Sequence, residues 1–164
     1  MALREGVDPQ RLGSFGVSMG GIASTMVAAV EPRLRVHVIA LAGGGIPQIV
    51  ATSHDRQLTK PLANYLQRNH LDRATLYRLM RNAVTTDPIR LAPYVDRENL
   101  FMLIALCDRT IGTANALRLW RALGQPETVF MTAGHYTAYL YLLYMKHAAL
   151  RFFQRHLSAE NPLR

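Results

Sequence analysis

The chain has little of what marks several large protein classes. Its 164 residues include one cysteine, Cys107, so neither an internal disulfide nor a cysteine-rich zinc site can form. No apolar run approaches the roughly 18 residues of a membrane-spanning helix. Residues 1–6 contain no apolar core followed by a cleavage site, so we expect no secretory signal there. These absences predict a cytoplasmic protein without a membrane partner or a bound metal.

Acidic side chains are also few. The 11 Asp and Glu face 19 Lys and Arg, which gives a formal net charge of +8. Such a balance raises the question of a nucleic-acid partner. The basic residues are dispersed as single arginines, are not interleaved with aromatic residues and never form a block of five. We therefore interpret them as a solvated surface and predict no nucleic-acid partner.

What the chain does contain is an alternation of strand and helix patterns. Its length predicts one domain over residues 1–164. Short apolar segments predict strands at 11–17, 35–41, 100–106 and 127–131. This alternation is typical of an α/β fold, with a parallel sheet of about four strands and helices on both faces.

Helical patterns fill the gaps between these segments, at 20–30, 73–83, 113–123 and 139–156. The last helix carries an apolar stripe formed by Leu142, Met145, Ala149, Phe152 and Phe153. Residues 46–99 differ from the rest, because two or three helices are expected there with no strand between them. We interpret 46–99 as a lid-like helical insertion, with Asp72 as the N-cap of the helix at 73–83.

The turn after the first predicted strand carries the first chemical signal. It contains Gly16, Ser18 and Gly20 in the pattern G-x-S-x-G, after a strand and before a helix, which is the context this motif requires. The glycines would let strand and helix approach without a Cβ clash. The Met19 N–H would lie at the helix N-terminus, where it can bind an oxyanion.

A serine nucleophile needs a base and a carboxylate that orients the base. Asp108 directly follows the predicted strand at 100–106, and His135 follows the last strand by a short loop that includes Gly134. Other carboxylates fit less well because they do not follow a strand. The other histidines lie in predicted strands, in the insertion or on the last helix. We therefore predict Ser18, His135 and Asp108 as a catalytic triad.

In this order the three residues resemble the α/β-hydrolase family, as does the acid loop at 108–111. The resemblance covers the C-terminal half of a family member only, whose nucleophile follows the fifth of about eight strands. It implies a truncated α/β-hydrolase domain, and the sequence leaves open a short reading frame, a gene fragment or an engineered half. It also implies that one oxyanion donor, normally on an earlier loop, must come from 43–45, the insertion or a second subunit.

The same resemblance bears on assembly. The strand at 11–17 would pair with a strand that this chain lacks, and would be left as an exposed sheet edge. Two such edges could join into a continuous eight-stranded sheet. We therefore expect a homodimer through this strand.

The activity that the triad predicts is that of an esterase acting through an acyl-enzyme, without a cofactor. We expect short-chain carboxylic esters and a promiscuous range, with Tyr136 as a candidate lining residue of the acyl pocket. A peptidase or an acyltransferase could use the same triad. From a different class, the chain could be a non-catalytic interaction module that binds a partner through its sheet edge.

Overall fold

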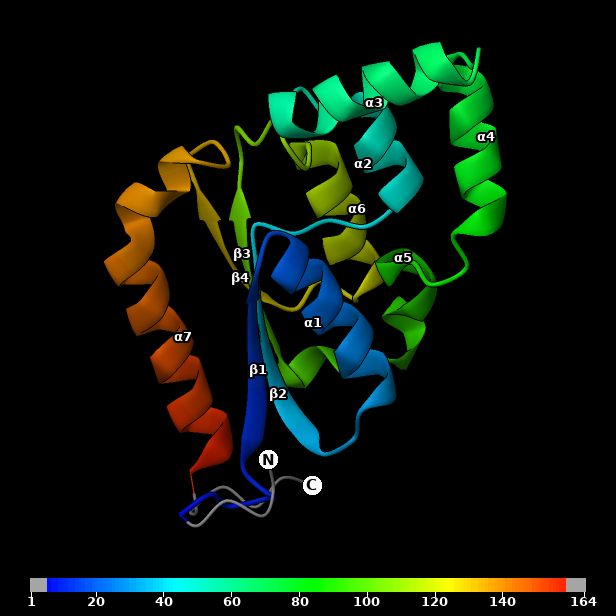
Figure 1. The fold of residues 1–164 in the computed structure, drawn as a ribbon. Coiled ribbons are helices and arrows are strands. Elements are labelled where there is room, and N and C mark those ends of the chain that lie inside the picture. The colour runs from blue at the N-terminus through cyan, green and yellow to red at the C-terminus, as the bar shows by residue number, and fades with distance from the viewer. Residues whose placement is uncertain (1–5, 159–164) are drawn as a thin grey trace.

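A four-stranded parallel sheet runs through the computed structural model, which describes residues 6–158 (Figure 1). The strands β1 (Leu12–Val17), β2 (Leu34–Ala40), β3 (Leu100–Ala105) and β4 (Glu127–Met131) lie side by side in chain order, and each neighbouring pair is parallel. The predicted α/β class is confirmed, and each strand bound lies within one residue of its prediction. Residues 1–5, on which the expectation about a secretory signal depends, lie outside the described part.

Helices cover both faces of this sheet. On one face lies α7 (Leu142–Leu157), and on the other lie α1 (Met19–Val30) and α6 (Thr113–Ala122), as Figure 1 shows. Because both faces are covered, the central strands β2 and β3 are apolar at almost every position, and every residue of β3 is buried.

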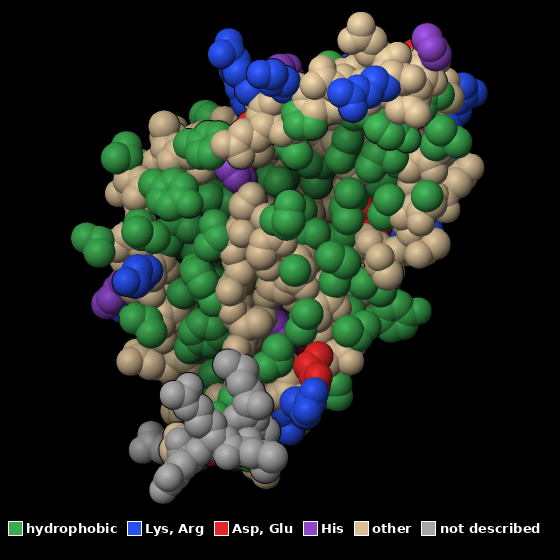
Figure 2. All heavy atoms as spheres, in the orientation of Figure 1, with side chains coloured by type: hydrophobic (Ala, Val, Ile, Leu, Met, Phe, Trp, Pro, Cys, Tyr) green, Lys and Arg blue, Asp and Glu red, His purple; other side chains and the backbone are tan. Residues whose placement is uncertain are grey.

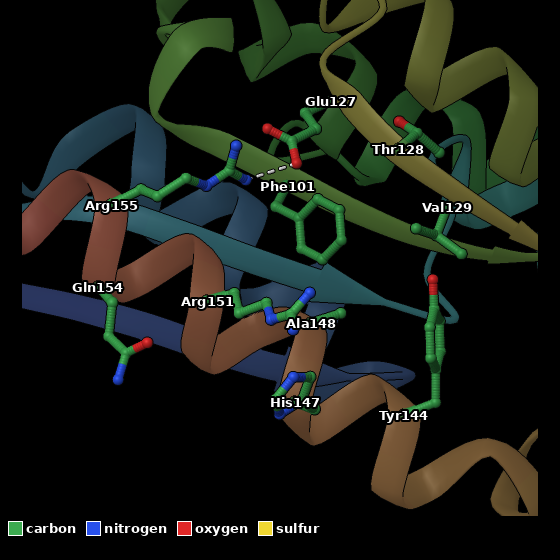
Figure 3. A pocket seen from close by; sticks show the side chains of 10 residues that line it. All are labelled: Phe101, Glu127, Thr128, Val129, Tyr144, His147, Ala148, Arg151, Gln154 and Arg155. Atoms are coloured by element: carbon green, nitrogen blue, oxygen red, sulfur yellow. Dashed lines mark hydrogen bonds and ion pairs between the residues drawn. The ribbon is translucent and has the colours of Figure 1, made fainter.

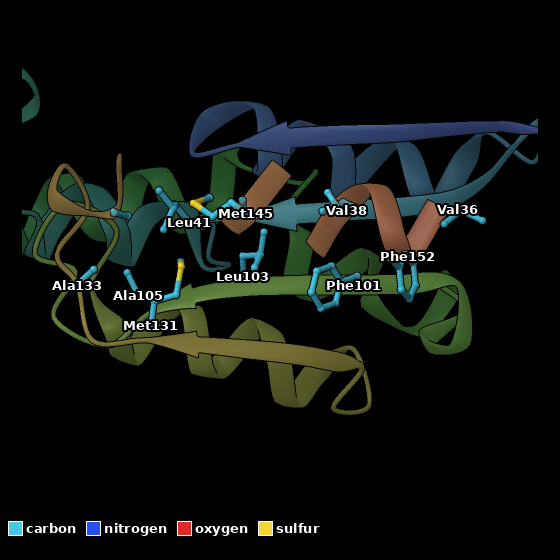
Figure 4. Packing of buried hydrophobic residues seen from close by; sticks show 13 residues of the cluster. Val36, Val38, Leu41, Phe101, Leu103, Ala105, Met131, Ala133, Met145 and Phe152 are labelled. Carbon is cyan, nitrogen blue, oxygen red and sulfur yellow. The ribbon is translucent and has the colours of Figure 1, made fainter. Parts of the chain in front are cut away.

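The two faces hold two hydrophobic cores. Under α7, side chains of the strands pack against Met145, Ala149 and Phe152, and the rings of Phe101 and Phe152 stack at 5.2 Å between centroids (Figure 4). On the other face, the alternate residues of β2 and β3 pack against α1 and α6; this second core is formed by Ile39, Ala42, Ala92, Leu100, Met102, Ile104, Ala116, Leu119 and Leu123.

The last helix differs from its prediction at its start. Residues Thr137–Tyr141 form a 3₁₀ turn (η3), and the α-helix begins only at Leu142. Leu142 is thus the first residue of α7, at the end of the helix that precedes the core under the sheet. Leu142, predicted as part of the apolar stripe, is 44% exposed, and the buried stripe begins at Met145.

Between β2 and β3 the chain forms more helices than predicted. These are α2 (Ile46–Thr52), α3 (Arg56–Arg68), α4 (Arg73–Ala83) and α5 (Pro88–Leu91), followed by the 3₁₀ turns Ala92–Tyr94 and Arg97–Asn99. The short α2 and α5 span too few turns to show a helical period. The predicted cap is confirmed, since the Asp72 carboxylate accepts a 2.6 Å hydrogen bond from the Thr75 N–H.

Within residues 6–158, no helix is both long and apolar enough to cross a membrane.

Candidate active site

The three predicted triad residues come together at one edge of the sheet. Ser18 follows β1, Asp108 follows β3 by a short turn, and His135 follows β4 in the same way. Since the strands are parallel, their carboxyl ends meet at one edge, which is where open α/β sheets bind ligands. The fold thus joins positions up to 117 residues apart in the chain.

A continuous chain of hydrogen bonds links these side chains. The Ser18 Oγ lies 2.9 Å from His135 Nε2, and His135 Nδ1 lies 2.7 Å from Asp108 Oδ2. An ionised carboxylate can only accept, so Nδ1 carries the proton and the Nε2 lone pair faces the serine hydroxyl. This is the arrangement in which an imidazole can take the proton of a serine.

The acid is held in place by its own loop. Asp108 is 5% exposed, and its Oδ1 accepts hydrogen bonds from the N–H groups of Thr110 (2.8 Å) and Ile111 (2.9 Å). These bonds fix one oxygen and leave Oδ2 aimed at the imidazole.

Ser18 lies on a strained turn. Its backbone has φ 55° and ψ −118°, a conformation that residues with a side chain rarely adopt. A Cβ on Gly16 would collide with the backbone carbonyl of Gly20, so glycine is required at position 16.

The predicted role of Gly20 is wrong, because a Cβ there would meet nothing within 4 Å. The close approach occurs one residue later: a Cβ on Gly21 would lie 2.8 Å from the Ala42 Cβ. The helix turns its next residue toward the sheet, so it is Gly21 that lets α1 pack closely against the end of β2.

The Met19 N–H, predicted as an oxyanion donor, lies at the N-terminus of α1. Met19 is the first residue of α1, and the first N–H groups of a helix have no acceptor within the helix. Residues 43–45 are one predicted source of a second oxyanion donor, but two of their N–H groups already donate hydrogen bonds within the chain. The Gly44 N–H donates to the Asn115 carbonyl, and the Gly45 N–H donates to the buried carboxylate of Asp87 at 2.9 Å.

An apolar cavity of about 400 Å³ opens beside the nucleophile. Ser18, His135 and Tyr136 line it. The sequence predicts Tyr136 as a lining residue of an acyl pocket, and the structure places it at this cavity. Its apolar wall is formed by Val17, Met19, Ile22, Leu41, Ile46, Ile49, Val50, Leu58 and Ile111. Five of these belong to the segment between β2 and β3, so that segment forms part of the pocket.

Asp55 is a neighbour of the site that the sequence did not reveal. Its carboxylate, at the N-cap of α3, accepts hydrogen bonds from the Tyr136 hydroxyl (2.5 Å) and from Thr110 Oγ1 (3.2 Å). The hydroxyl of Tyr136 lowers the pKa of Asp55, and the carboxylate raises the pKa of Tyr136. The sequence shows Asp55 only as a polar loop residue beside a histidine, so nothing in it signals this contact.

A larger cavity, of about 670 Å³, lies away from the triad (Figure 3). It is bounded by α7 and by residues near the amino ends of β3 and β4, such as Phe101 and Glu127. Arg155 pairs with Glu127 across it at 2.6 Å. Because the triad lies at the opposite ends of these strands, this cavity has no part in its chemistry.

No protein-family model matches the sequence, and a comparison with curated proteins finds no match either. Solved structures do match. The Pyrococcus furiosus esterase Pf2001 superposes with a TM-score of 0.62 at 15% identity, over 91% of this chain and 55% of that one. The acetyl xylan esterase of Paenibacillus sp. R4 gives 0.71 at 21% identity, over 94% and 48%. The acylaminoacyl peptidase of Pyrococcus horikoshii gives 0.67 at 17% identity, over 96% and 26%.

These likenesses establish the fold. The four parallel strands with their flanking helices are part of an α/β-hydrolase fold of the kind that such esterases have, as the sequence predicted. The chain spans about half the length of the two esterases it is compared with.

Proposed function

We propose that this chain is a serine hydrolase that cleaves carboxylic esters. The observation that carries the proposal is the continuous Ser18–His135–Asp108 hydrogen-bond chain on a strained turn beside an apolar cavity. The esterase structures that share the fold support the same class of reaction.

In the proposed mechanism, the Ser18 Oγ attacks the ester carbonyl carbon while His135 Nε2 takes the hydroxyl proton. The Met19 N–H stabilises the negative charge on the carbonyl oxygen. The intermediate then expels the alcohol, which receives the proton from His135 and leaves an acyl group on Ser18. Water then attacks the acyl carbon while His135 takes one of its protons. The bond to Ser18 Oγ breaks, the acid is released, and His135 returns the proton to Ser18 Oγ. Asp108 keeps the imidazole oriented throughout.

The shape of the cavity supports a class of substrate. A volume of about 400 Å³ with mostly apolar walls accommodates a small acyl group. Three of the polar side chains that line it, Asp55, Thr110 and Tyr136, are hydrogen-bonded to one another, which leaves them less able to select one alcohol over another. We therefore propose short-chain carboxylic esters with a broad range of alcohols. Comparing p-nitrophenyl esters with p-nitroanilides separates this reading from a peptidase, since the triad alone does not.

The test of this function is covalent labelling of the nucleophile. Purified protein is treated with a fluorophosphonate, digested and analysed by mass spectrometry. Labelling of Ser18 that disappears in His135→Ala, together with turnover of p-nitrophenyl butyrate, would support the proposal. A chain that turns over no ester and is not labelled at Ser18 would overturn it.

A second candidate function, binding through the sheet edge, is favoured by a different observation. β1 is one of the two edge strands of the described sheet, and apolar side chains are exposed on it and at its carboxyl end, with Phe15 45% and Met19 77% exposed. Figure 2 shows hydrophobic side chains gathered on this face, over α7 as well as beside β1. Exposed apolar surface around an unpaired strand is a common basis for association.

We propose a second copy of the chain as the occupant of this edge, paired β1 to β1 in an eight-stranded sheet. The strand Leu12–Val17 carries no charged residue, so such pairing places no like charges at its centre despite the net charge of +8. Light scattering should give twice the chain mass, and Phe15→Lys should give a monomer. A monodisperse wild-type monomer would overturn the homodimer.

A further inference from the structure

Asp55 lies where the helical segment between β2 and β3 meets the loops that carry the acid and the base. Its Oδ1 caps α3 by accepting the Gln57 N–H at 2.8 Å, and its Oδ2 accepts from both Tyr136 and Thr110. The adjacent His54 N–H donates to the Arg109 carbonyl at 3.0 Å. One short stretch of chain therefore makes three hydrogen bonds to the triad loops.

Both side-chain donors stand next to triad residues. Tyr136 follows His135 in the chain, and its ring lies edge-on to the imidazole at 5.4 Å between centroids. Thr110 donates its N–H to Asp108. The Asp55 carboxylate is therefore hydrogen-bonded directly to the loop that carries His135 and to the loop that carries Asp108.

The two helices that follow Asp55, α3 and α4, bury little of their surface. Neither α3 nor α4 has a buried residue, so burial of apolar side chains does little to hold them against the sheet. A short hydrogen bond to an ionised carboxylate is among the stronger polar contacts in a protein. The junction at Asp55 is thus well placed to fix the start of α3.

This junction is also a wall of the cavity at Ser18. Asp55, Gln57 and Leu58 line the cavity from the helical segment, and Tyr136 lines it from the base loop. Tyr136 is 55% exposed, so the contact lies at the rim and not at the base of the cavity. A hydrogen bond between these two walls closes the cavity at that rim.

We propose that the Asp55–Tyr136 hydrogen bond is a latch that holds the start of α3 against the base loop and so limits the length of the acyl group that the site accepts. The latch deepens the esterase proposal, and its role in selecting substrate rests on that proposal. Asp55 and Tyr136 are then specificity-determining residues and take no part in proton transfer.

The test uses variants that remove the latch while keeping its surroundings. Tyr136→Phe keeps the ring and removes the hydroxyl, and Asp55→Ser keeps an N-cap residue too short to reach Tyr136. Tyr144→Phe is the matched control, because Tyr144 lies on α7 beside the other cavity. Two readouts are taken: hydrogen–deuterium exchange over residues 46–68, and kcat/KM for p-nitrophenyl esters from acetate to octanoate.

Both latch variants should raise amide exchange over 46–68, while Tyr144→Phe leaves it as in the wild type. Both should raise the octanoate-to-acetate ratio of kcat/KM about tenfold or more, since admitting a single further methylene to an apolar pocket is worth a factor of this order. The double variant should add little to either single one. Unchanged exchange in both variants would overturn the latch, and raised exchange with an unchanged ratio would overturn its role in selection.

Failure of the esterase proposal would look different. A wild type that hydrolyses none of these esters, with exchange raised in both variants, would support the latch and remove the function. Exchange does not depend on turnover, so the two proposals fail by separate observations.

Discussion

Two serine–histidine hydrogen bonds occur within residues 6–158, and the groups around them differ. Ser14 Oγ lies 2.8 Å from His37 Nδ1, and Ser18 Oγ lies 2.9 Å from His135 Nε2. By distance alone the two pairs are equivalent. A serine–histidine hydrogen bond therefore says little about function until the groups around it are considered.

The first pair is a product of strand register. Ser14 on β1 is the direct partner of His37 on β2, so their side chains meet as any cross-strand neighbours would. The Ser14 hydroxyl also bonds to the hydroxyl of Ser24 on α1. His37 is 4% exposed, and its burial lowers its pKa. The group is a buried polar link between sheet and helix.

The second pair has three things that the first is without. Asp108 orients the imidazole from its far nitrogen, the Ser18 backbone is strained in a turn, and a helix N-terminus begins at the next residue. The strained turn and the helix start lie together at the end of β1, and Asp108 comes from the loop after β3. Packing of the sheet does not require these features to meet at Ser18, so their meeting there indicates a catalytic role.

The largest expected effect comes from removing the group that only the second pair has. Asp108→Asn should lower kcat for p-nitrophenyl butyrate by about 10⁴, because the amide favours the wrong imidazole tautomer. Asp96→Asn, a carboxylate that caps the 3₁₀ turn Arg97–Asn99, serves as the control and should change kcat less than about threefold. A comparable loss in the control, or none in Asp108→Asn, would contradict the assigned role.

A smaller effect, on stability, is expected when Gly16 and Gly20, the two glycines beside Ser18, are each replaced by alanine. Gly16→Ala should lower the free energy of unfolding by about 2 kcal/mol or more, since its Cβ meets the backbone at Gly20. Gly20→Ala should raise it by about 0.5–1 kcal/mol, because alanine is the better helix former and has open space there. Urea unfolding of both variants measures the difference, and equal effects would show that the turn is not as tight as described.

The smallest effect concerns the pH dependence of the first pair. Burial lowers the pKa of His37 in the folded chain. Between the folded and the unfolded pKa, the imidazole is therefore protonated in the unfolded chain and neutral in the folded one. Stability should be full above the unfolded pKa of about 6.5 and fall, by on the order of 1 kcal/mol, as pH drops through the folded pKa. Urea unfolding at pH 7.5 and pH 5 should show this loss, and His37→Gln should reduce it. An identical loss in the variant would place its origin elsewhere.

Much of this architecture could be predicted from sequence for a physical reason. Buried parallel strands are almost continuously apolar, as in Leu100–Ala105, so they stand out in a sequence. The triad could be found because Ser18, Asp108 and His135 all follow such strands, and the ends of parallel strands meet. At these positions the sequence pattern that marks a strand end also determines which residues are close together in the fold.

Prediction failed for residues whose contacts depend on how helices are placed in the fold and not on a local sequence pattern. Asp55 reaches the site through the fold of the helical segment, and no period or spacing relates it to Tyr136. Gly21 contacts Ala42 because of how α1 is rotated on the sheet, which the pentapeptide pattern cannot show. Leu142 is exposed because α7 begins there, one turn before the first residue of the helix that packs in the core.

The most direct measurement compares the two serines. Initial rates of p-nitrophenyl butyrate hydrolysis are taken for the wild type, Ser18→Ala and Ser14→Ala at equal protein concentration, with circular dichroism to establish that each chain is folded. The account predicts that Ser18→Ala falls to the uncatalysed rate while Ser14→Ala stays within about threefold of the wild type. Equal rates for the wild type and Ser18→Ala, or a loss confined to Ser14→Ala, would contradict it.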